Sequence, residues 1–382
     1  MSASTPFAEL SDAALTAELQ QLEQDYRKAC NTNLKLNLTR GKPADAQLDL
    51  ANKLDGILGG NYLSANGTDV RNYGGIRGLP EARELGAELL GVKPESVIAG
   101  GNSSLELMHS VASFVIRKLW NQFPARALCP VPGYDRHFTL CEDLGMSMIG
   151  TELTPDGPDM AALEELVARD ASIGCIWCVP RFSNPDGCVY SPEVVKRIAA
   201  LPKKAAHPHF MIFWDNAYAV HTLAEPAPSL ASLFDAAKNQ GSLDHLFMFA
   251  STSKITFAGS GVAFCSASDA NLTAYETELT PTTIGPDKVN QLRTAKFLRG
   301  RLQQHMAAHA AILRPKFATV QQQLDEQLGR LGIAEWTQPK GGYFVSLNTL
   351  PGLAKEVVAL AGSAGVTLTA AGATFPLSLI HI

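Results

Sequence analysis

The chain has 382 residues, of which 46% are apolar and 18% charged, and its formal net charge is −5. This composition can bury a large core and excludes an intrinsically disordered chain. A negative net charge without a long run of lysine and arginine argues against a nucleic-acid-binding surface, and no apolar stretch of about 18 residues indicates a membrane span.

Short apolar runs alternate with helical patterns along most of the chain, after an N-terminal helix predicted over 11–30. In chain order the predicted strand and helix pairs are 96–99 with 104–120, 127–130 with 134–145, 147–151 with 159–169 and 174–179 with 191–201, and further strands are predicted at 210–215, 246–250 and 261–266. Such strands predict an α/β fold, with a mostly parallel sheet between helices and ligands at the carboxyl ends of its strands. A long helix over 286–330, a turn and strand from Pro339, and a helix over 351–364 are predicted next.

Two residues at predicted strand ends supply what pyridoxal phosphate requires of a protein. Asp215 ends the apolar run 210–214, where an ionised carboxylate needs a partner, and Lys254 follows 39 positions later, behind Ser251-Thr-Ser. An amine that forms a Schiff base must be partly unprotonated, and a carboxylate beside the pyridine nitrogen keeps the ring protonated. Alone, such a lysine is more commonly a solvated surface residue, and the acid could equally cap a helix or form an ion pair.

Four further side chains at strand ends are candidates for the same site. Tyr218 could donate to the phenolic oxygen of the cofactor, and Asn184, in the turn Asn-Pro-Asp-Gly, could bind near the same oxygen. Tyr134 could stack on the ring, and His137 could lie behind Asp215. Each of these residues also fits routine core packing or turn formation when it is taken alone.

A glycine- and serine-rich segment predicts a phosphate cradle between a strand and a helix. Backbone N–H groups at a helix start bind anions, and hydroxyls add further donors. The candidate residues are Asn102, Ser103 and Ser104, with Ser251 as a further hydroxyl.

Together these motifs resemble the class I/II aminotransferases of the type I pyridoxal-phosphate fold, in the order that this family shows. They are Asn72-Tyr-Gly-Gly-Ile-Arg-Gly, the glycine-serine cradle, Pro132-Gly-Tyr with His137, Asn184-Pro-x-Gly, Asp215-x-x-Tyr, Ser251-x-x-Lys and Pro339-x-Gly-Gly-Tyr-Phe. The wording of Asn37-Leu-Thr-Arg-Gly-Lys-Pro and of Ser251-Thr-Ser-Lys-Ile-Thr-Phe looks closest to the bacterial aspartate aminotransferase subgroup Ic.

The resemblance implies a ping-pong transaminase, with aspartate and 2-oxoglutarate as the substrate pair. Lys254 would be the Schiff-base lysine and the general base and acid, with Asp215 and Tyr218 as further catalytic residues. Tyr73 would reach the phosphate in a neighbouring subunit, which implies a homodimer. Gly41, in the loop that also carries the weaker candidate cations Arg40 and Lys42, would lie on the substrate side with Asn184.

The family also implies a large cofactor-binding domain and a smaller α+β domain made from both termini. The expected boundaries are 1–64 and 291–382 for the small domain and 65–290 for the large one. Seven scattered cysteines, with no leader-like pattern at the start, predict a reduced cytoplasmic protein without a metal site.

Two departures from the family pattern affect the site. Val262 stands eight residues after Lys254, where most members place a phosphate-binding arginine, and no arginine follows Arg330 to bind the substrate α-carboxylate. Residues 377–382 look like translated adapter sequence, so we expect the natural sequence to end near Pro376 in a truncated reading frame.

Three alternatives to a fully active transaminase remain. The same cofactor could serve an amino-acid lyase or decarboxylase, because the outcome depends on which Cα bond is perpendicular to the ring. A ligand-sensing module is a second alternative, although the N-terminal segment lacks the basic charge and length of a DNA-binding unit. A truncated fragment that binds cofactor and turns over poorly is the third.

Overall fold

The computed structural model describes residues 6–122 and 124–376. The segment 377–382, for which the sequence predicts a departure from the natural chain, lies outside the described residues.

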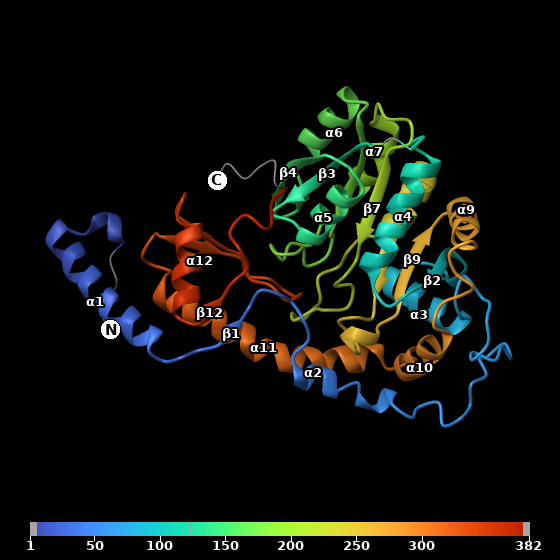
Figure 1. Cartoon of the computed structure of the whole chain (residues 1–382). Helices are drawn as coiled ribbons and strands as arrows, with labels where there is room; N and C mark the ends of the chain where they lie inside the picture. The colour runs from blue at the N-terminus through green and yellow to red at the C-terminus, as the bar shows by residue number, and fades with distance from the viewer. Residues whose placement is uncertain (1–5, 123, 377–382) are drawn as a thin grey trace.

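An eight-stranded sheet forms the centre of the larger part of the molecule (Figure 1). Its strands are β2 (Val97–Ala99), β3 (Arg126–Val131), β4 (Met148–Thr154), β5 (Gly157–Pro158), β6 (Ile173–Cys178), β7 (Met211–Asp215), β8 (Leu246–Ser251) and β9 (Ala263–Ala267). The spatial order is β2-β9-β8-β7-β6-β3-β4-β5, and the run from β8 to β4 is parallel throughout. This confirms the predicted α/β fold with a mostly parallel sheet.

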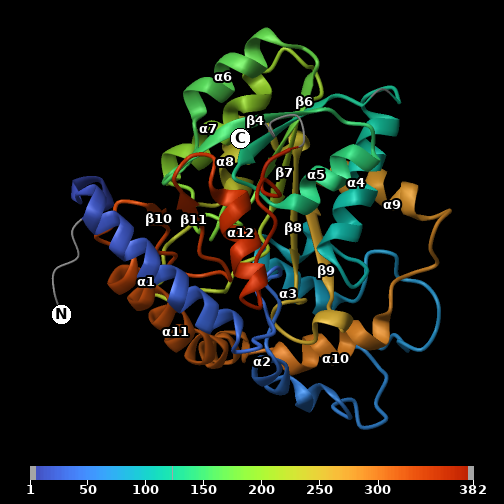
Figure 2. The same ribbon diagram turned by 60° about the vertical axis from the view of Figure 1, so that its left-hand side comes forward.

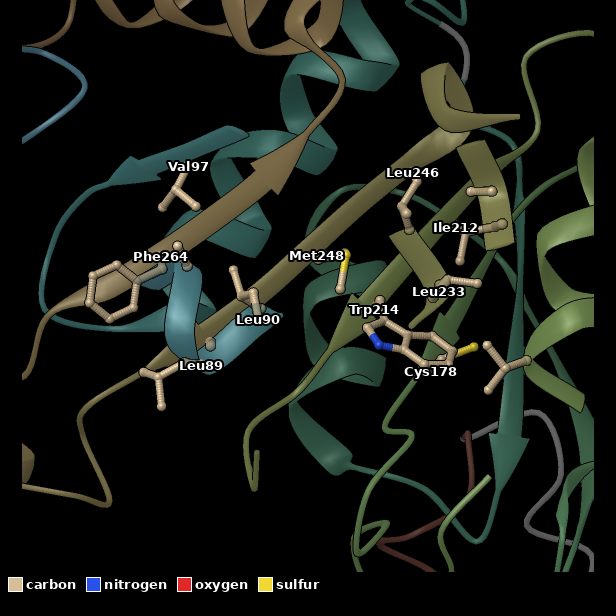
Figure 3. Packing of buried hydrophobic residues seen from close by; sticks show 14 of the residues in the cluster. Leu89, Leu90, Val97, Cys178, Ile212, Trp214, Leu233, Leu246, Met248 and Phe264 are labelled. Carbon is tan, nitrogen blue, oxygen red and sulfur yellow. The ribbon is translucent and has the colours of Figure 1, made fainter. Parts of the chain in front are cut away.

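Helices cover both faces of this sheet because successive strand residues point to opposite sides. The helices are α3 (Pro80–Leu90), α4 (Ser104–Lys118), α5 (Asp135–Asp143), α6 (Met160–Arg169), α7 (Pro192–Lys204), α8 (Leu233–Gln240) and α9 (Asp269–Leu279). In β7, Ile212 and Trp214 belong to the core under α3, α6, α7 and α8 (Figure 3), while Phe213 belongs to the core under α4, α5 and α9. Asp215 continues the alternation on the Phe213 side.

The N-terminal and C-terminal segments of the described chain lie together beside this sheet (Figures 1 and 2). The remaining elements are α1 (Asp12–Cys30), β1 (Leu36–Asn37), α2 (Asp45–Asp49), α10 (Lys288–Leu298), α11 (Leu302–Gln327), β10 (Ala334–Trp336), β11 (Leu347–Thr349), α12 (Ala354–Ser363) and β12 (Val366–Thr367), with short 3₁₀ helices at Phe7–Glu9, Asn52–Leu54, Pro94–Ser96, Leu243–His245 and Ala258–Ser260. Strand β1 pairs in parallel with β12, so the N-terminal segment joins a C-terminal strand. Within the described ranges no helix combines the length and apolar character that crossing a membrane requires.

Two predicted elements differ in the structure. The helix predicted over 286–330 is split into α10 and α11 at Gly300, whose φ of +66° is left-handed. The strand predicted after Pro339 begins only at Leu347. Gly341 forms a single bridge with Thr222 instead, and Gly342 has φ +77°, so this stretch is a loop held against the segment that follows β7.

Candidate active site

A pocket of about 280 Å³, measured with its open mouth, lies at the carboxyl ends of the central strands. It is lined by Ser104, Tyr134, Val179, Asn184, Asp215, Ala217, Tyr218 and Lys254. Asp215 is the last residue of β7, and Lys254 follows β8, which pairs with β7 in parallel. The sheet therefore brings together side chains that lie far apart in the sequence.

Lys254 lies in the turn that follows β8, with its amine directed over an aromatic ring. Its Nζ is 5.0 Å from the ring centroid of Tyr218. Desolvation lowers the pKa of Lys254, and the negative charge of Asp215 opposes this shift only in part. A lysine with a lowered pKa holds more unprotonated, nucleophilic amine near neutral pH, which is what condensation with an aldehyde requires.

Asp215 is 1% exposed and has one oxygen bound and one free. Its Oδ2 is 3.2 Å from Nε2 of His137, and the imidazole of His137 stacks on Trp177 with ring centroids 4.7 Å apart. Its Oδ1 is buried and has no hydrogen-bond partner among the described residues. Leaving a buried carboxylate oxygen without a donor is costly, so this atom fits a ligand N–H that enters the pocket.

Two tyrosines line the pocket as hydrogen-bond donors. Burial, with a smaller contribution from the charge of Asp215, raises the pKa of Tyr134 to about 12. Burial also raises the pKa of Tyr218 well above its usual value. Both hydroxyls therefore keep their protons at physiological pH and can donate to an oxygen of a bound ligand.

The predicted cradle lies at the start of α4. Ser104 is the first helical residue and lines the pocket, whereas the Ser103 hydroxyl accepts a hydrogen bond from the N–H of Leu105 at 3.2 Å and caps the helix. The Ser253 hydroxyl donates to the Asn102 carbonyl at 3.1 Å, and Ser251 donates to Ser253 at 3.2 Å. The start of α4 and the Ser103 hydroxyl, which accepts a hydrogen bond and still has its own proton to donate, form an edge that suits a phosphate.

Val262 supplies no cation to this edge. Its side chain is buried, and its N–H donates to the Thr252 hydroxyl at 2.9 Å. The position where the family pattern places an arginine is therefore part of the backbone framework beneath the lysine turn.

Not every predicted residue lines the pocket. Tyr73 is 80% exposed on a loop outside it. Gly41 lies against Phe344, where an added Cβ would come within 2.7 Å of the ring. Arg40 is paired with Asp135 at 2.7 Å, so its charge is already matched.

Two apolar walls of the pocket were not among the residues predicted from the sequence. Val179 and Ala217 line it beside Asn184 and Asp215. Their signal was available, because Val179 is the last residue of the predicted strand 174–179 and Ala217 follows the predicted strand 210–215 by two positions, where ligand-lining residues are expected.

Comparison with known proteins gives a consistent result. The family model described as aspartate amino-transferase matches residues 10–379. An aspartate aminotransferase of Corynebacterium glutamicum is 42% identical over 369 residues, which is 94% of this chain and 85% of that protein. The crystal structure of an aspartate transaminase from the same species has a TM-score of 0.93 at 41% identity and covers 98% of this chain and 90% of its own.

A more distant structure shares the fold. The α-aminoadipate aminotransferase of Thermus thermophilus, solved with N-(5′-phosphopyridoxyl)-L-leucine, has a TM-score of 0.74 at 21% identity and covers 92% of this chain and 86% of its own. The fold and these matches define a pyridoxal-phosphate-dependent aminotransferase of fold type I. Within that class the chain belongs to the aspartate aminotransferase family.

Proposed function

We propose that this aminotransferase exchanges the amino group between aspartate and 2-oxoglutarate at the pocket that contains Lys254 and Asp215. The observation that carries the proposal is the shared pocket of a lysine with a lowered pKa and a buried aspartate with one free oxygen. The substrate pair rests on the 42% identical relative, which is named an aspartate aminotransferase.

The buried polar groups fit pyridoxal phosphate. The free Oδ1 of Asp215 would accept a hydrogen bond from the protonated ring nitrogen, and His137 holds the other oxygen. Tyr218 and Asn184 would bind the phenolic oxygen, Tyr134 would lie against the ring, and Asn102, Ser103, Ser104 and Ser251 would surround the phosphate. When bound, the cofactor supplies an aldehyde that condenses with amines and a ring that accepts electrons from Cα.

Lys254 has two tasks in this proposal. Its Nζ would first hold the cofactor, and once the substrate amine has replaced it there, Nζ would take the proton from substrate Cα and deliver it to C4′ of the cofactor. Desolvation suits both tasks because it keeps the amine partly unprotonated. The Asp215 carboxylate would lie beside the ring nitrogen, where a fixed negative charge stabilises the positive charge that the reaction needs.

The decisive experiment incubates the purified protein with pyridoxal phosphate, aspartate and 2-oxoglutarate and follows glutamate. We expect glutamate and oxaloacetate to form in equal amounts, and Lys254→Ala to abolish both. Release of carbon dioxide or ammonia without glutamate would instead show the decarboxylase or lyase alternative.

We further propose a homodimer in which Tyr73 of one protomer contributes to the site of its partner, in a cytoplasmic protein. The proposed division is a large domain over 65–290 and a small domain over 1–64 and 291–382. The pairing of β1 with β12 supports this division because it joins the two terminal segments. The high exposure of Tyr73 supports the proposed contact, since such a ring is available to a partner.

A further inference from the structure

Two buried histidines bind two consecutive carbonyls of the turn that carries Lys254. Nε2 of His221 lies 3.1 Å from the carbonyl oxygen of Lys254, and Nε2 of His305 lies 2.7 Å from that of Ile255. His221 follows β7 and His305 belongs to α11, so the contacts come from separate parts of the chain. Neither histidine lines the pocket.

These contacts fix the two peptide planes that follow the lysine. The N–H groups of Ile255 and Thr256 donate to the Thr252 carbonyl at 2.8 and 2.9 Å. Each plane is therefore held at its N–H by Thr252 and at its carbonyl by an imidazole. With both ends of each plane held, the backbone that follows Lys254 cannot rotate freely, and these contacts restrict the direction in which its Cα–Cβ bond leaves the turn.

The proton positions follow from the acceptors. A carbonyl oxygen only accepts, so Nε2 of both histidines carries a proton. Nδ1 of His221 is buried without a partner among the described residues, so a second proton would have no acceptor there. Burial lowers the pKa of His221 to about 3, and Lys254, His309 and Arg181 add positive charge around it. His221 thus stays a neutral donor.

Both histidines are connected to the segments outside the large sheet. The carbonyl of His221 accepts from the N–H of Gly342 at 2.9 Å. His305 contacts His309 at 3.1 Å, and His309 contacts the Gln47 side chain at 3.1 Å. Gln47 donates to the Tyr343 hydroxyl at 2.9 Å. The loop at 341–343 and helix α2 therefore reach the lysine turn through buried polar contacts.

We propose that His221 and His305 are positioning residues for Lys254, which hold its backbone so that its amine stays in the desolvated pocket. The inference rests on the proposed role of Lys254 in the reaction. If either imidazole donor is removed, the carbonyl that it binds is left buried without a partner. The turn is then expected to shift so that this carbonyl reaches solvent. The amine is then better solvated, and its pKa rises toward that of an ordinary lysine.

The test measures the amine itself in cofactor-free protein. Wild type, His221→Leu, His221→Gln, His305→Leu and His305→Gln are labelled with trace acetic anhydride from pH 6 to 10, and labelling at Lys254 is quantified by peptide mass spectrometry. We expect both leucine variants to lose about tenfold in labelling at pH 7, which corresponds to about one unit in pKa. The glutamine variants, which keep a donor near the Nε2 position, should stay within about twofold of wild type.

His245→Leu is the matched control. Nδ1 of His245 contacts the Phe210 carbonyl at 2.8 Å, a bond of the same kind far from the lysine turn. This variant should lower stability comparably and leave the Lys254 labelling profile unchanged. The proposal would be overturned if the Lys254 labelling profiles of the His221→Leu and His305→Leu variants matched that of wild type. It would also be overturned if the glutamine variants lost as much labelling as the leucine variants.

Nitrogen NMR of histidine-labelled wild type gives a second test that needs no variant to fold. His221 should be neutral with the proton on Nε2 from pH 5 to 8. His305 should carry its proton on Nε2 at pH 8, and a proton on Nδ1 alone in either ring would contradict the assignment. Borohydride reduction of the cofactor-loaded wild type separates the two ideas. If Lys254 carries no cofactor, the proposed function fails, whereas the labelling comparison still decides whether the histidines hold the turn.

Discussion

At the residue scale, the same pair of side chains occurs in two settings. His137 and Asp215 are 3.2 Å apart and almost fully buried, whereas His109 and Asp143 are 2.8 Å apart and exposed. Solvent screens the exposed pair, and the buried aspartate keeps one oxygen free beside the pocket. Only the buried pair can place an unscreened carboxylate charge opposite a nitrogen of a bound ligand.

Asp215→Asn should therefore lower kcat about 10²–10³-fold, because a fixed charge is removed from the place where positive charge must be stabilised. Steady-state kinetics with aspartate and 2-oxoglutarate measure this effect. Asp143→Asn makes the same chemical change in the exposed pair and should stay within about twofold of wild type. Equal losses in the two variants would remove the special role of Asp215.

The lowered pKa of His221 predicts a loss of stability in acid. Its pKa is about 3 in the folded protein and 6.5 in an ordinary histidine, so the unfolded chain binds the proton first as pH falls. The stability contributed by neutral His221 is complete above pH 6.5 and is lost progressively down to about pH 3.

Urea unfolding of wild type and His221→Gln tests this expected loss of stability in acid. The difference in unfolding free energy between them should shift by about 2 kcal/mol against wild type from pH 7 to pH 5. A constant difference would show that His221 titrates normally.

At the element scale, the sequence was informative where local pattern decides the structure. The apolar runs ending at Asp215 and before Lys254 predicted β7 and β8, and the rule that parallel strand ends meet predicted that both residues share one site. The prediction of one continuous helix over 286–330 was wrong at Gly300, whose left-handed backbone interrupts a segment of residues that otherwise favour helix formation. The histidine contacts were not predictable, because Gln47, His221 and His305 are distant in sequence and no local pattern marks their pairing.

Close packing of α3 on the sheet gives a prediction about two glycines in helices. A Cβ at Gly86 would meet the Phe264 ring at 2.5 Å, whereas a Cβ at Gly362 in α12 would meet nothing within 4 Å. Gly86→Ala should destabilise the protein by about 1–3 kcal/mol through overpacking. Gly362→Ala should stabilise it by up to about 1 kcal/mol, because alanine favours the helix. Urea midpoints measure both, and two stabilising changes would mean that α3 does not approach β9 this closely.

At the scale of the whole molecule, the central question is how complete one protomer is. The pocket supplies the lysine, the aspartate and two tyrosines from a single chain. Tyr73, which the family pattern places at the phosphate, lies 80% exposed outside it. Our proposal therefore requires a second copy of the chain to complete the site.

Mixing two inactive variants tests this requirement. One protomer carries Lys254→Ala and the other Tyr73→Ala, and they are unfolded and refolded together. If Tyr73 acts in the site of its partner, half of the dimers are mixed and each regains one wild-type site, which gives about a quarter of wild-type activity. Light scattering should show a dimer throughout. Activity no greater than the mean of the separate variants would show that Tyr73 does not cross between protomers.

The most direct measurement for the central claim locates the covalent attachment of the cofactor. The protein is loaded with pyridoxal phosphate, reduced with borohydride, digested and mapped by mass spectrometry. The account predicts one phosphopyridoxyl group per chain, on the ε-nitrogen of Lys254. A label on any other lysine, or no label at all, would contradict it.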